Sequence, residues 1–537
     1  MKQFFVIILL CNIVYTSFSK IIEGGAYYST TKEITFDLDH SDYMRDWYIS
    51  TEDDPNVLYL YCENPIELTF HLPSQDLNFL VSNLDTIRLV FIINDKDSVN
   101  TLIIGVHDIP NNISEDEKLF HLSRLWSEVK YNFVNIDQID FDWDSLYKAY
   151  IPLVKNTSND YDFYRILQRF YATLHDGHTE VYMPYSLTAY EDYVPVAIDY
   201  FDKQLYITST IALDYDSSFL AAKILMINNI PIHQYLQDSI FPYISASTEQ
   251  SLWMRIPQAI CYGLRCKPLV FEIQKQNGEK ASMNLVRNGE ATRRENIQHC
   301  RLREKTSEPW DFVQLFWHQD SILQLSINSF YPDEYVISLI AKKENEIQKA
   351  KGLIIDLRQN GGGSTVVAHY LQSHLTQAPY FINFAWQSRI NDGVRKANGN
   401  WIKEYEDYYL EKAYRTEAGD TIAIADSIQR WSMPTVVLFG EYTFSAAEDF
   451  LVNLYETPNR PLFIGKESGG STGSPLVIND LPLDGYARLC TRRILFPYSQ
   501  TAFVGKGVQP DIEISTSFNN FLTGEDVTLQ KTIELFH

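Results

Sequence analysis

The sequence predicts an α/β core with a mostly parallel sheet over residues 306–537, preceded by a β domain, a helical segment and a second β-rich module. Two observations favour this fold class. Short apolar runs rich in β-branched residues alternate with stretches whose apolar residues recur at helical spacing, and such runs are typical of parallel strands covered on both faces. The runs are 322–327, 352–357, 435–439 and 462–465, and the helical stretches are 333–350, 364–376 and 445–456.

The composition indicates a folded protein with several domains. A chain of 537 residues predicts about two to four domains rather than a single core. Its hydrophobic content of 45% and aromatic content of 14% are those of a globular protein. The 69 acidic residues outnumber the 45 basic ones, for a net charge of −24, which argues against nucleic acid and anionic membranes as main partners.

Residues 1–19 have the features of a secretory signal peptide: a basic end, a short apolar run, and small residues at Ser17 and Ser19 before the expected cleavage point. This apolar run is too short to span a membrane readily, and no later stretch of the sequence approaches ~18 consecutive apolar residues. Cys11 is an imperfect candidate for lipidation because Leu10 before it is not small. We therefore expect a cleaved, exported protein without a membrane span, in the periplasm, at the cell surface or outside the cell.

Five of the six cysteines remain after such cleavage, too few and too scattered for a disulfide scaffold. Cys261 and Cys266 could form a disulfide, and buried free thiols are an equal alternative. The spacing of the cysteines is not that of zinc ligands. The sequence thus predicts neither a metal site nor a cofactor site.

Residues 20–110 contain short alternating runs separated by polar turns, which predicts a small β-sandwich-like domain. The runs are 34–38, 57–61, 66–72, 87–93 and 102–106. No catalytic combination of residues occurs there, so an accessory role and a purely structural role both remain open.

Residues 113–190 are expected to form a helical segment. Ser114 and Glu117 have the spacing of a capping box, and the apolar residues after them mark one face of a helix. Two further helices are expected over 143–151 and 163–174.

The last of these expected helices is followed by the short sequence Asp176, Gly177 and His178. If Gly177 stops the helix, His178 lies just beyond its C-terminal end. A lone histidine in such a place is more often a surface or capping residue than a catalytic one.

Ser445 is predicted to lie at a strand-to-helix turn. A buried strand over 435–439 ends at Gly440, and a helical pattern begins at Ser445. The free N–H groups of the first turn of a helix can face an oxyanion, which suits a nucleophilic hydroxyl at this position. The alternative is that Ser445 only caps the helix, since serine is a favoured cap residue.

Three glycines follow the other buried strand of the core. Residues 352–357 run into Gly361, Gly362 and Gly363 before a helix begins. Glycines let a backbone approach a substrate closely and adopt positive φ. The loop is not a phosphate-binding P-loop, because no Gly-Lys-Ser/Thr follows, and a structural glycine turn is the remaining alternative.

These three stretches, in this order, resemble the tail-specific (C-terminal processing) serine peptidase family. They are most similar to its branch that contains tricorn protease and the interphotoreceptor retinoid-binding protein repeats. The likeness spans roughly residues 113–515 and implies a ClpP/crotonase-like α/β core. It also implies a PDZ-like module over 193–290, in which Asn229 stands at the place of a usual glycine. Such a module can bind a peptide as an added strand, or it can be only a spacer or lid.

The resemblance implies an endopeptidase that acts on polypeptides, with Ser445 as nucleophile and His178 as general base. It assigns the backbone N–H groups of Gly362 and Ala446 to the oxyanion hole. Residues 378–432, rich in tyrosine, tryptophan and charge, form an insertion that could wall or gate the site. The sequence predicts neither the oligomeric state nor the cleavage preference.

The sequence departs from the family pattern in two places. The best-known branch uses a Ser–Lys dyad, but Ser471 stands where that lysine is expected and Lys466 is displaced, so His178 is the favoured base and Lys466 the alternative. Tricorn-like members orient their histidine with a glutamate that has no counterpart here. Candidates for its role are Asp176, Glu467 and Gln500. A base without its orienting group works poorly, so a protein that binds peptides or small ligands without hydrolysing them is the competing class.

Overall fold

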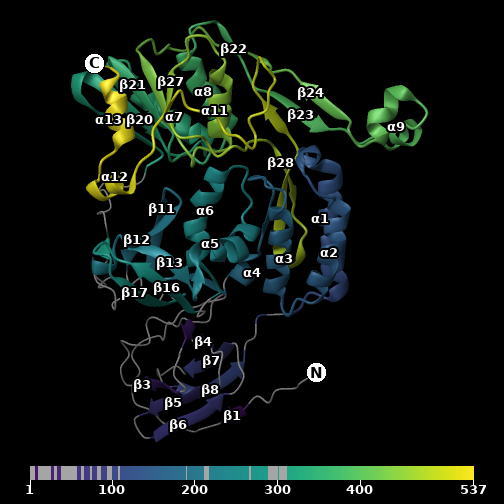
Figure 1. Cartoon of the computed structure of the whole chain (residues 1–537), viewed down its shortest axis with the longest axis vertical. Helices are drawn as coiled ribbons and strands as arrows, with labels where there is room; N and C mark the ends of the chain where they lie inside the picture. Colours follow the sequence, from purple (N-terminus) through teal and green to yellow (C-terminus); the bar gives the residue numbers. More distant parts are fainter. Residues whose placement is uncertain are drawn as a thin grey trace.

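The computed structural model describes residues 109, 111–188, 190–210, 217–264, 268–287, 300–301 and 311–536, together with the backbone of eight strands that precede them. Of the expected signal peptide, only β1 (Ile7–Leu9) falls within the described residues. Figure 1 shows the α/β core, the helical segment and the β-rich module as neighbouring bodies.

The strands before residue 107 form two sheets. One has the order β1-β8-β7-β4-β2 and the other has the order β3-β5-β6. Their bounds are β2 (Ala26–Tyr28), β3 (Glu33–Asp37), β4 (Val57–Tyr61), β5 (Ile66–Leu72), β6 (Gln75–Val81), β7 (Thr86–Ile93) and β8 (Val99–Val106). The five predicted runs all coincide with strands, and β2 and β6 are additional strands that the analysis of runs missed.

A six-stranded sheet forms the centre of the α/β core. Its order is β19-β20-β21-β26-β27-β31, and every neighbouring pair is parallel except β19 with β20. The strands are β19 (Val313–Trp317), β20 (Ile322–Ile327), β21 (Gly352–Asp356), β26 (Thr435–Phe439), β27 (Leu462–Gly465) and β31 (Ile512–Glu513). The mixed α/β fold with a mostly parallel sheet is therefore confirmed.

Alternation along each strand explains why helices cover both faces of this sheet. Leu353 and Ile355 point into the larger core cluster, whereas Ile354 between them belongs to a cluster on the opposite face. The larger cluster is formed with α7 (Asp333–Ile347), α8 (Thr365–Leu375) and α11 (Ala446–Tyr455), and α13 (Val527–Glu534) covers the other face (Figure 1). Because β21 and β26 are parallel neighbours, the loops after them emerge at the same edge of the sheet.

The helical segment has the predicted three helices, each with a side-chain cap. They are α1 (Glu115–Asn132), α2 (Trp143–Lys155) and α3 (Asp160–Ala172), capped by Ser114, Asp142 and Asn159. The interpretation of Gly177 as the stop of the third helix was wrong. The helix already ends at Ala172, and the left-handed residue in the following turn is His175, at φ 48°.

An antiparallel sheet forms the main part of the β-rich module. It contains β11 (Val196–Phe201), β12 (Gln204–Thr210), β13 (Lys223–Ile227), β16 (Pro268–Gln274) and β17 (Lys280–Val286), and α6 (Glu249–Cys261) packs on β11. Asn229 has positive φ, as its place in the sequence predicted, and so does Asn228. The likeness of this module to PDZ domains stays a prediction.

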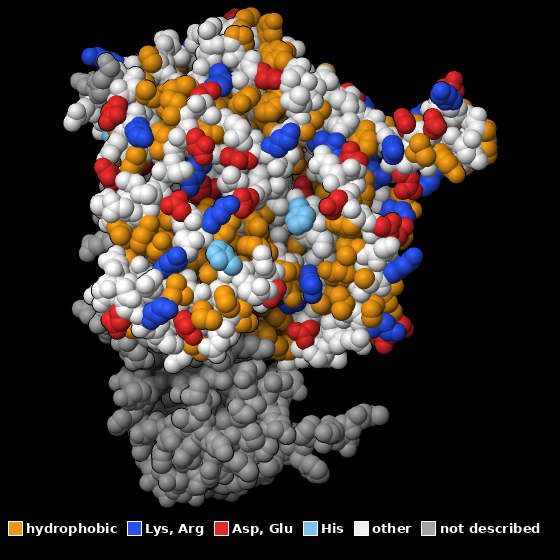
Figure 2. Space-filling view, in the orientation of Figure 1, with side chains coloured by type: hydrophobic (Ala, Val, Ile, Leu, Met, Phe, Trp, Pro, Cys, Tyr) orange, Lys and Arg blue, Asp and Glu red, His pale blue; other side chains and the backbone are white. Residues whose placement is uncertain are grey.

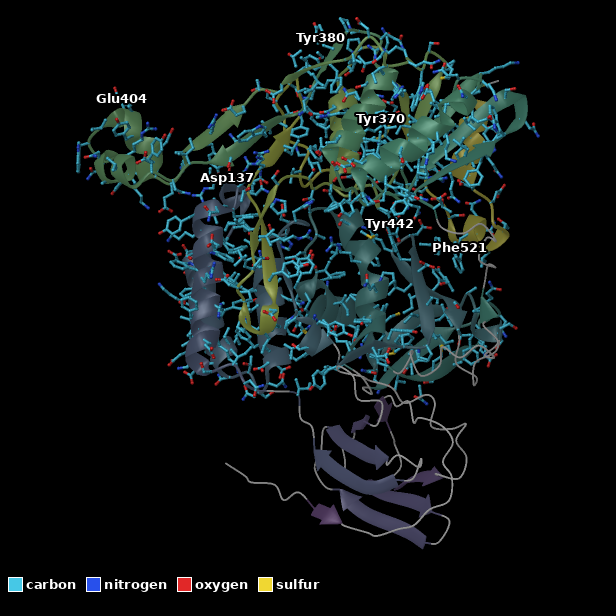
Figure 3. All side chains as sticks on the ribbon, turned by 180° about the vertical axis from the view of Figure 1, so that it is seen from behind. Asp137, Tyr370, Tyr380, Glu404, Tyr442 and Phe521 are labelled. Carbon is cyan, nitrogen blue, oxygen red and sulfur yellow. The ribbon has the colours of Figure 1, made fainter. Side chains whose placement is uncertain are left out.

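The middle of the insertion 378–432 forms an arm, whereas Trp431 near its end is buried in the core. The strands of the arm, β23 (Ala385–Arg389) and β24 (Tyr414–Glu417), lead to two short helices, α9 (Gly393–Asn398) and α10 (Glu406–Tyr409). The arm projects outward from the core, and Glu404 lies at its far end (Figure 3). Because the tip of the arm points away from the core, the structure does not support a gating role for the tip.

Charges of both signs are interspersed on the face shown in Figure 2, so this face offers no continuous basic surface to a nucleic acid. No helix among the described residues is long and apolar enough to cross a membrane. Cys261 is a free thiol, and Cys266 lies outside the described residues.

Candidate active site

Ser445 is the residue directly before α11 and has the unusual backbone angles φ 56° and ψ −128°. Non-glycine residues hold such angles only where the surrounding structure enforces them. Here Thr443 supplies much of that constraint, because its hydroxyl accepts from Gly440 N at 3.1 Å and donates to Leu357 O at 2.8 Å. The turn between β26 and α11 is thereby tied to the end of β21, and the serine is held in a strained position.

His178 lies against this serine although it is 267 residues away in sequence. Its Nε2 is 3.1 Å from Ser445 Oγ, and its Nδ1 is 2.8 Å from Ser471 Oγ. The imidazole stacks on the ring of Phe444, with 4.7 Å between ring centroids and 6° between planes. The two ring nitrogens and the ring face are thus all in contact, so the position of the imidazole is well defined.

Asp176 supports the loop that carries His178 rather than its ring. One of its carboxylate oxygens accepts from the backbone N of His178 and from Thr179 Oγ1, both at 2.9 Å. Asp176, one of the three candidates for orienting the imidazole, therefore does not take that role, because its carboxylate binds the backbone and the threonine of its own turn.

The other two candidates for orienting His178 also lie elsewhere. Glu467 accepts from the side chain of Gln250 at 3.0 Å, and Gln500 is an exposed turn residue with φ 56°. Lys466 faces Glu441, with 3.4 Å between Nζ and Oε1, in a different cavity from the dyad. The Ser–Lys alternative is consequently not favoured by the geometry.

The residue that contacts Nδ1 is Ser471, and Glu448 holds it in place. Glu448 Oε2 accepts from Ser471 N at 3.0 Å, and Oε1 accepts from Gly470 N at 2.7 Å and from Ser468 Oγ at 2.5 Å. The same Oε2 accepts from Ser445 N at 3.2 Å, which connects the two serines through one buried carboxyl group. Neither Ser471 nor Glu448 was predicted as a site residue.

Burial dominates the electrostatics of the site. It lowers the pKa of His178 to about 3, and the positive charges of Arg488 and Arg255 act in the same direction. Burial also raises the pKa of Glu448 to about 8, although the hydrogen bonds from Ser468, Gly470, Ser471 and Ser445 oppose this shift. An imidazole with a depressed pKa is neutral near pH 7 and free to accept a proton.

Gly362 lies directly beside Ser445. A Cβ atom at this position would be 2.7 Å from Ser445 Cβ and 3.0 Å from Ala446 N, and its φ is 96°. However, Gly362 N donates to Asn360 Oδ1 at 2.9 Å, so its assignment as a free oxyanion donor needs correction: the amide of Asn360 occupies it. Ala446 N has no hydrogen bond to another described residue. It therefore remains available as the predicted donor to the oxyanion.

These positions show what sequence reasoning missed. The spacing of Ser445 and Glu448 is that of a capping box, which was a usable signal for Glu448. Ser471 was noted only as the residue at the place of a lysine. Among the described residues, no group of three or more His, Cys, Asp or Glu side chains could hold a metal ion.

Comparison with known families adds independent evidence. Residues 321–514 match the model of peptidase family S41, and residues 114–172 match the Tricorn protease C1 domain. No curated protein matches the chain. The match confirms the resemblance found in the sequence, and the α/β core has the fold of the S41 peptidases.

Two solved structures of mature CPAF have a similar fold. Mature CPAF complexed with lactacystin and mature CPAF alone each align at a TM-score of 0.57 with 13% identity, over 79% of this chain and 98% and 96% of theirs. The photosystem II D1 C-terminal processing protease aligns at a TM-score of 0.41 with 15% identity, over 74% of this chain and 93% of its own.

Proposed function

We propose that this serine-type peptidase is an exported endopeptidase that hydrolyses polypeptides with Ser445 as nucleophile and His178 as general base. The observation that carries the proposal is the 3.1 Å contact between Ser445 Oγ and His178 Nε2. A nucleophile and a base at hydrogen-bond distance are the central requirement of acyl transfer by serine. Export is inferred from the sequence of residues 1–19.

The reaction needs one particular tautomer of the imidazole, and the contacts of the ring are compatible with it. For Nε2 to accept the hydroxyl proton, the other proton must be on Nδ1, and Ser471 Oγ lies 2.8 Å from Nδ1 as its acceptor. Ser445 Oγ then attacks the substrate carbonyl while its proton passes to Nε2. The imidazolium returns this proton to the leaving amine, and the same base activates the water that hydrolyses the acyl-enzyme.

Ala446 N–H is proposed to stabilise the oxyanion of the tetrahedral intermediate. It belongs to the first turn of α11, where backbone N–H groups lack intrahelical partners and carry partial positive charge. Gly362 N can assist only if the amide of Asn360 releases it when substrate binds.

Labelling with a fluorophosphonate probe tests the proposed function. We expect the wild-type protein to be labelled at Ser445, because the reagent requires an activated serine, and the variant Ser445→Ala to remain unlabelled. Mass spectrometry of the labelled peptide identifies the site. A folded wild-type protein that takes no label, or takes it equally in Ser445→Ala, would overturn the assignment.

The pH dependence of labelling should reflect the depressed pKa of His178. The neutral imidazole is the active form, and a folded-state pKa of about 3, below the ordinary 6.5, keeps it neutral as the pH falls. We therefore expect the labelling rate to stay nearly constant from about pH 7 to about pH 5, where an unperturbed histidine would lose most of its activity. Pseudo-first-order labelling rates, with circular dichroism at each pH as a control for folding, measure this. A decline centred near 6.5 would contradict the buried environment described for the ring.

Replacing Ser471 by alanine should lower kcat by about ten- to a hundredfold, because the Nδ1 proton loses its acceptor and the ring its orientation. Ser471→Thr, which keeps the hydroxyl, is the conservative control and should restore part of the rate. The diagnostic is a fall in kcat with little change in KM, accompanied by a changed histidine signal in ¹H NMR. Equal losses in both variants would indicate a role in loop packing only.

A further inference from the structure

A second feature near the dyad is a cavity of about 600 Å³ between the helical segment and the β-rich module. Its walls come from α3, from α6 and from β9 (Glu180–Tyr182). The volume lies within the range of ligand-binding pockets, roughly 300–1,000 Å³. The mechanism described above assigns no lining residue a part in proton transfer or in binding the oxyanion.

This cavity adjoins the catalytic histidine. Glu180 and Val181 on its wall follow His178 by two and three residues along the chain. On the opposite wall, Ser245 precedes Ser247, whose hydroxyl accepts from Gly177 N at 2.8 Å. Arg255, a further lining residue, is close enough for its charge to lower the pKa of His178. These links place the cavity close to the loop that carries the base.

Three arginines line the cavity, and we name it the arginine cavity after Arg165, Arg255 and Arg287. Two glutamates, Glu180 and Glu191, also line it, so the formal balance is three positive charges against two negative ones. Burial raises the pKa of Glu191, and this shift is opposed by the Tyr161 hydroxyl, which donates to Glu191 at 2.8 Å, and by the charges of Arg165 and Arg287.

Each of the three arginines is held in place by neighbouring groups. Arg165 donates from Nη1 to Gln168 Oε1 at 2.7 Å and lies over the ring of Tyr243, 4.1 Å from its centroid. Arg287 is fixed through Nε and Nη2, which donate to two carbonyl groups at the end of α6 at 3.3 and 3.1 Å. Arg255 forms an ion pair with Glu180, with 3.6 Å between Nη1 and Oε1. Guanidinium groups fixed in this way are suited to bind a planar carboxylate.

We propose that the arginine cavity is a specificity subsite that accepts an acidic side chain, Asp or Glu, of the polypeptide substrate. The proposal rests on the proposed function for the identity of the ligand as a polypeptide. A cavity with excess positive charge near the base favours substrates that carry a carboxylate at a fixed distance from the scissile bond.

Cleavage of matched peptides tests the subsite. A series of internally quenched peptides with amidated C-termini would carry a single Glu, moved one position at a time across the cleavage site, with Gln peptides as references. We expect one position at which Glu raises kcat/KM over Gln by about tenfold. The double variant Arg165→Gln and Arg255→Gln should reduce this Glu/Gln ratio to near one. Arg124→Gln, which removes an equivalent charge on α1 outside the cavity, should leave the ratio unchanged.

Binding measured without turnover separates this proposal from the proposed function. In a Ser445→Ala background, calorimetry should show tighter binding of the Glu peptide than of the Gln peptide, and the two arginine substitutions should abolish the difference. If no peptide is cleaved by the wild type but this binding preference is present, the subsite stands and the proposed function fails. Equal binding of the two peptides, a preference that persists in the arginine variant, or a preference only for a free C-terminal carboxylate would overturn the subsite.

Discussion

Replacing His178 by alanine is expected to lower kcat/KM by about 10⁴-fold or more, because the base at hydrogen-bond distance from Ser445 Oγ is removed. A serine hydroxyl without a base is a weak nucleophile at neutral pH. The residual rate should come from substrate binding and from the N–H donor at Ala446. Initial rates on a quenched peptide, with active-site titration of each preparation, measure the effect.

Two control variants make this result decisive. Lys466→Ala should retain most of the activity, because its ammonium group faces Glu441 rather than the serine. His233→Ala removes an exposed histidine in the β-rich module and controls for nonspecific loss of an imidazole. If Lys466→Ala is inactive and His178→Ala retains activity, the protein uses a Ser–Lys dyad and the contact between Ser445 and His178 has no catalytic meaning.

Replacing Gly362 by alanine is expected to reduce kcat/KM by about a hundredfold or more, with a folded protein. The new Cβ would lie 2.6 Å from Phe444 O and 2.7 Å from Ser445 Cβ, closer than atoms approach without a shift of the backbone. The residue also has a φ of 96°, which L-amino acids rarely adopt. Both effects displace the serine from the imidazole and narrow the space in front of Ala446 N.

Gly361→Ala is the matched control, since nothing lies within 4 Å of a Cβ atom at that position. We expect it to be nearly as active as the wild type. Thermal unfolding of both variants distinguishes misplacement from loss of fold. Equal activity of Gly362→Ala and Gly361→Ala would show that the close approach of the glycine loop to Ser445 does not matter for turnover.

Much of the core could be predicted because its signals are local. Apolar runs such as 352–357 and 435–439 determine strands by their residue type, and the glycines and Ser445 that follow them are fixed by sequence distance. Their proximity then follows from the parallel pairing of β21 with β26. The approach of His178 could not be derived in this way and was predicted only from family resemblance.

The missed contacts depend on how irregular loops fold. Ser471 reaches the imidazole because backbone N–H groups of its loop converge on Glu448, and no pattern of spacing encodes that convergence. The occupation of Gly362 N by Asn360 is likewise a detail of one turn. The chain also ends its third helix at Ala172 rather than near Gly177, because His175 accepts the left-handed conformation that glycine was expected to supply.

His178 and Ser445 lie beside two different hydrophobic clusters, and the cluster beside His178 is completed by Ile478, Leu481 and Leu489 from the C-terminal part of the chain. The distance between base and nucleophile therefore depends on how these distant segments pack together. A substitution that loosens this packing should separate the reactive pair without touching either residue.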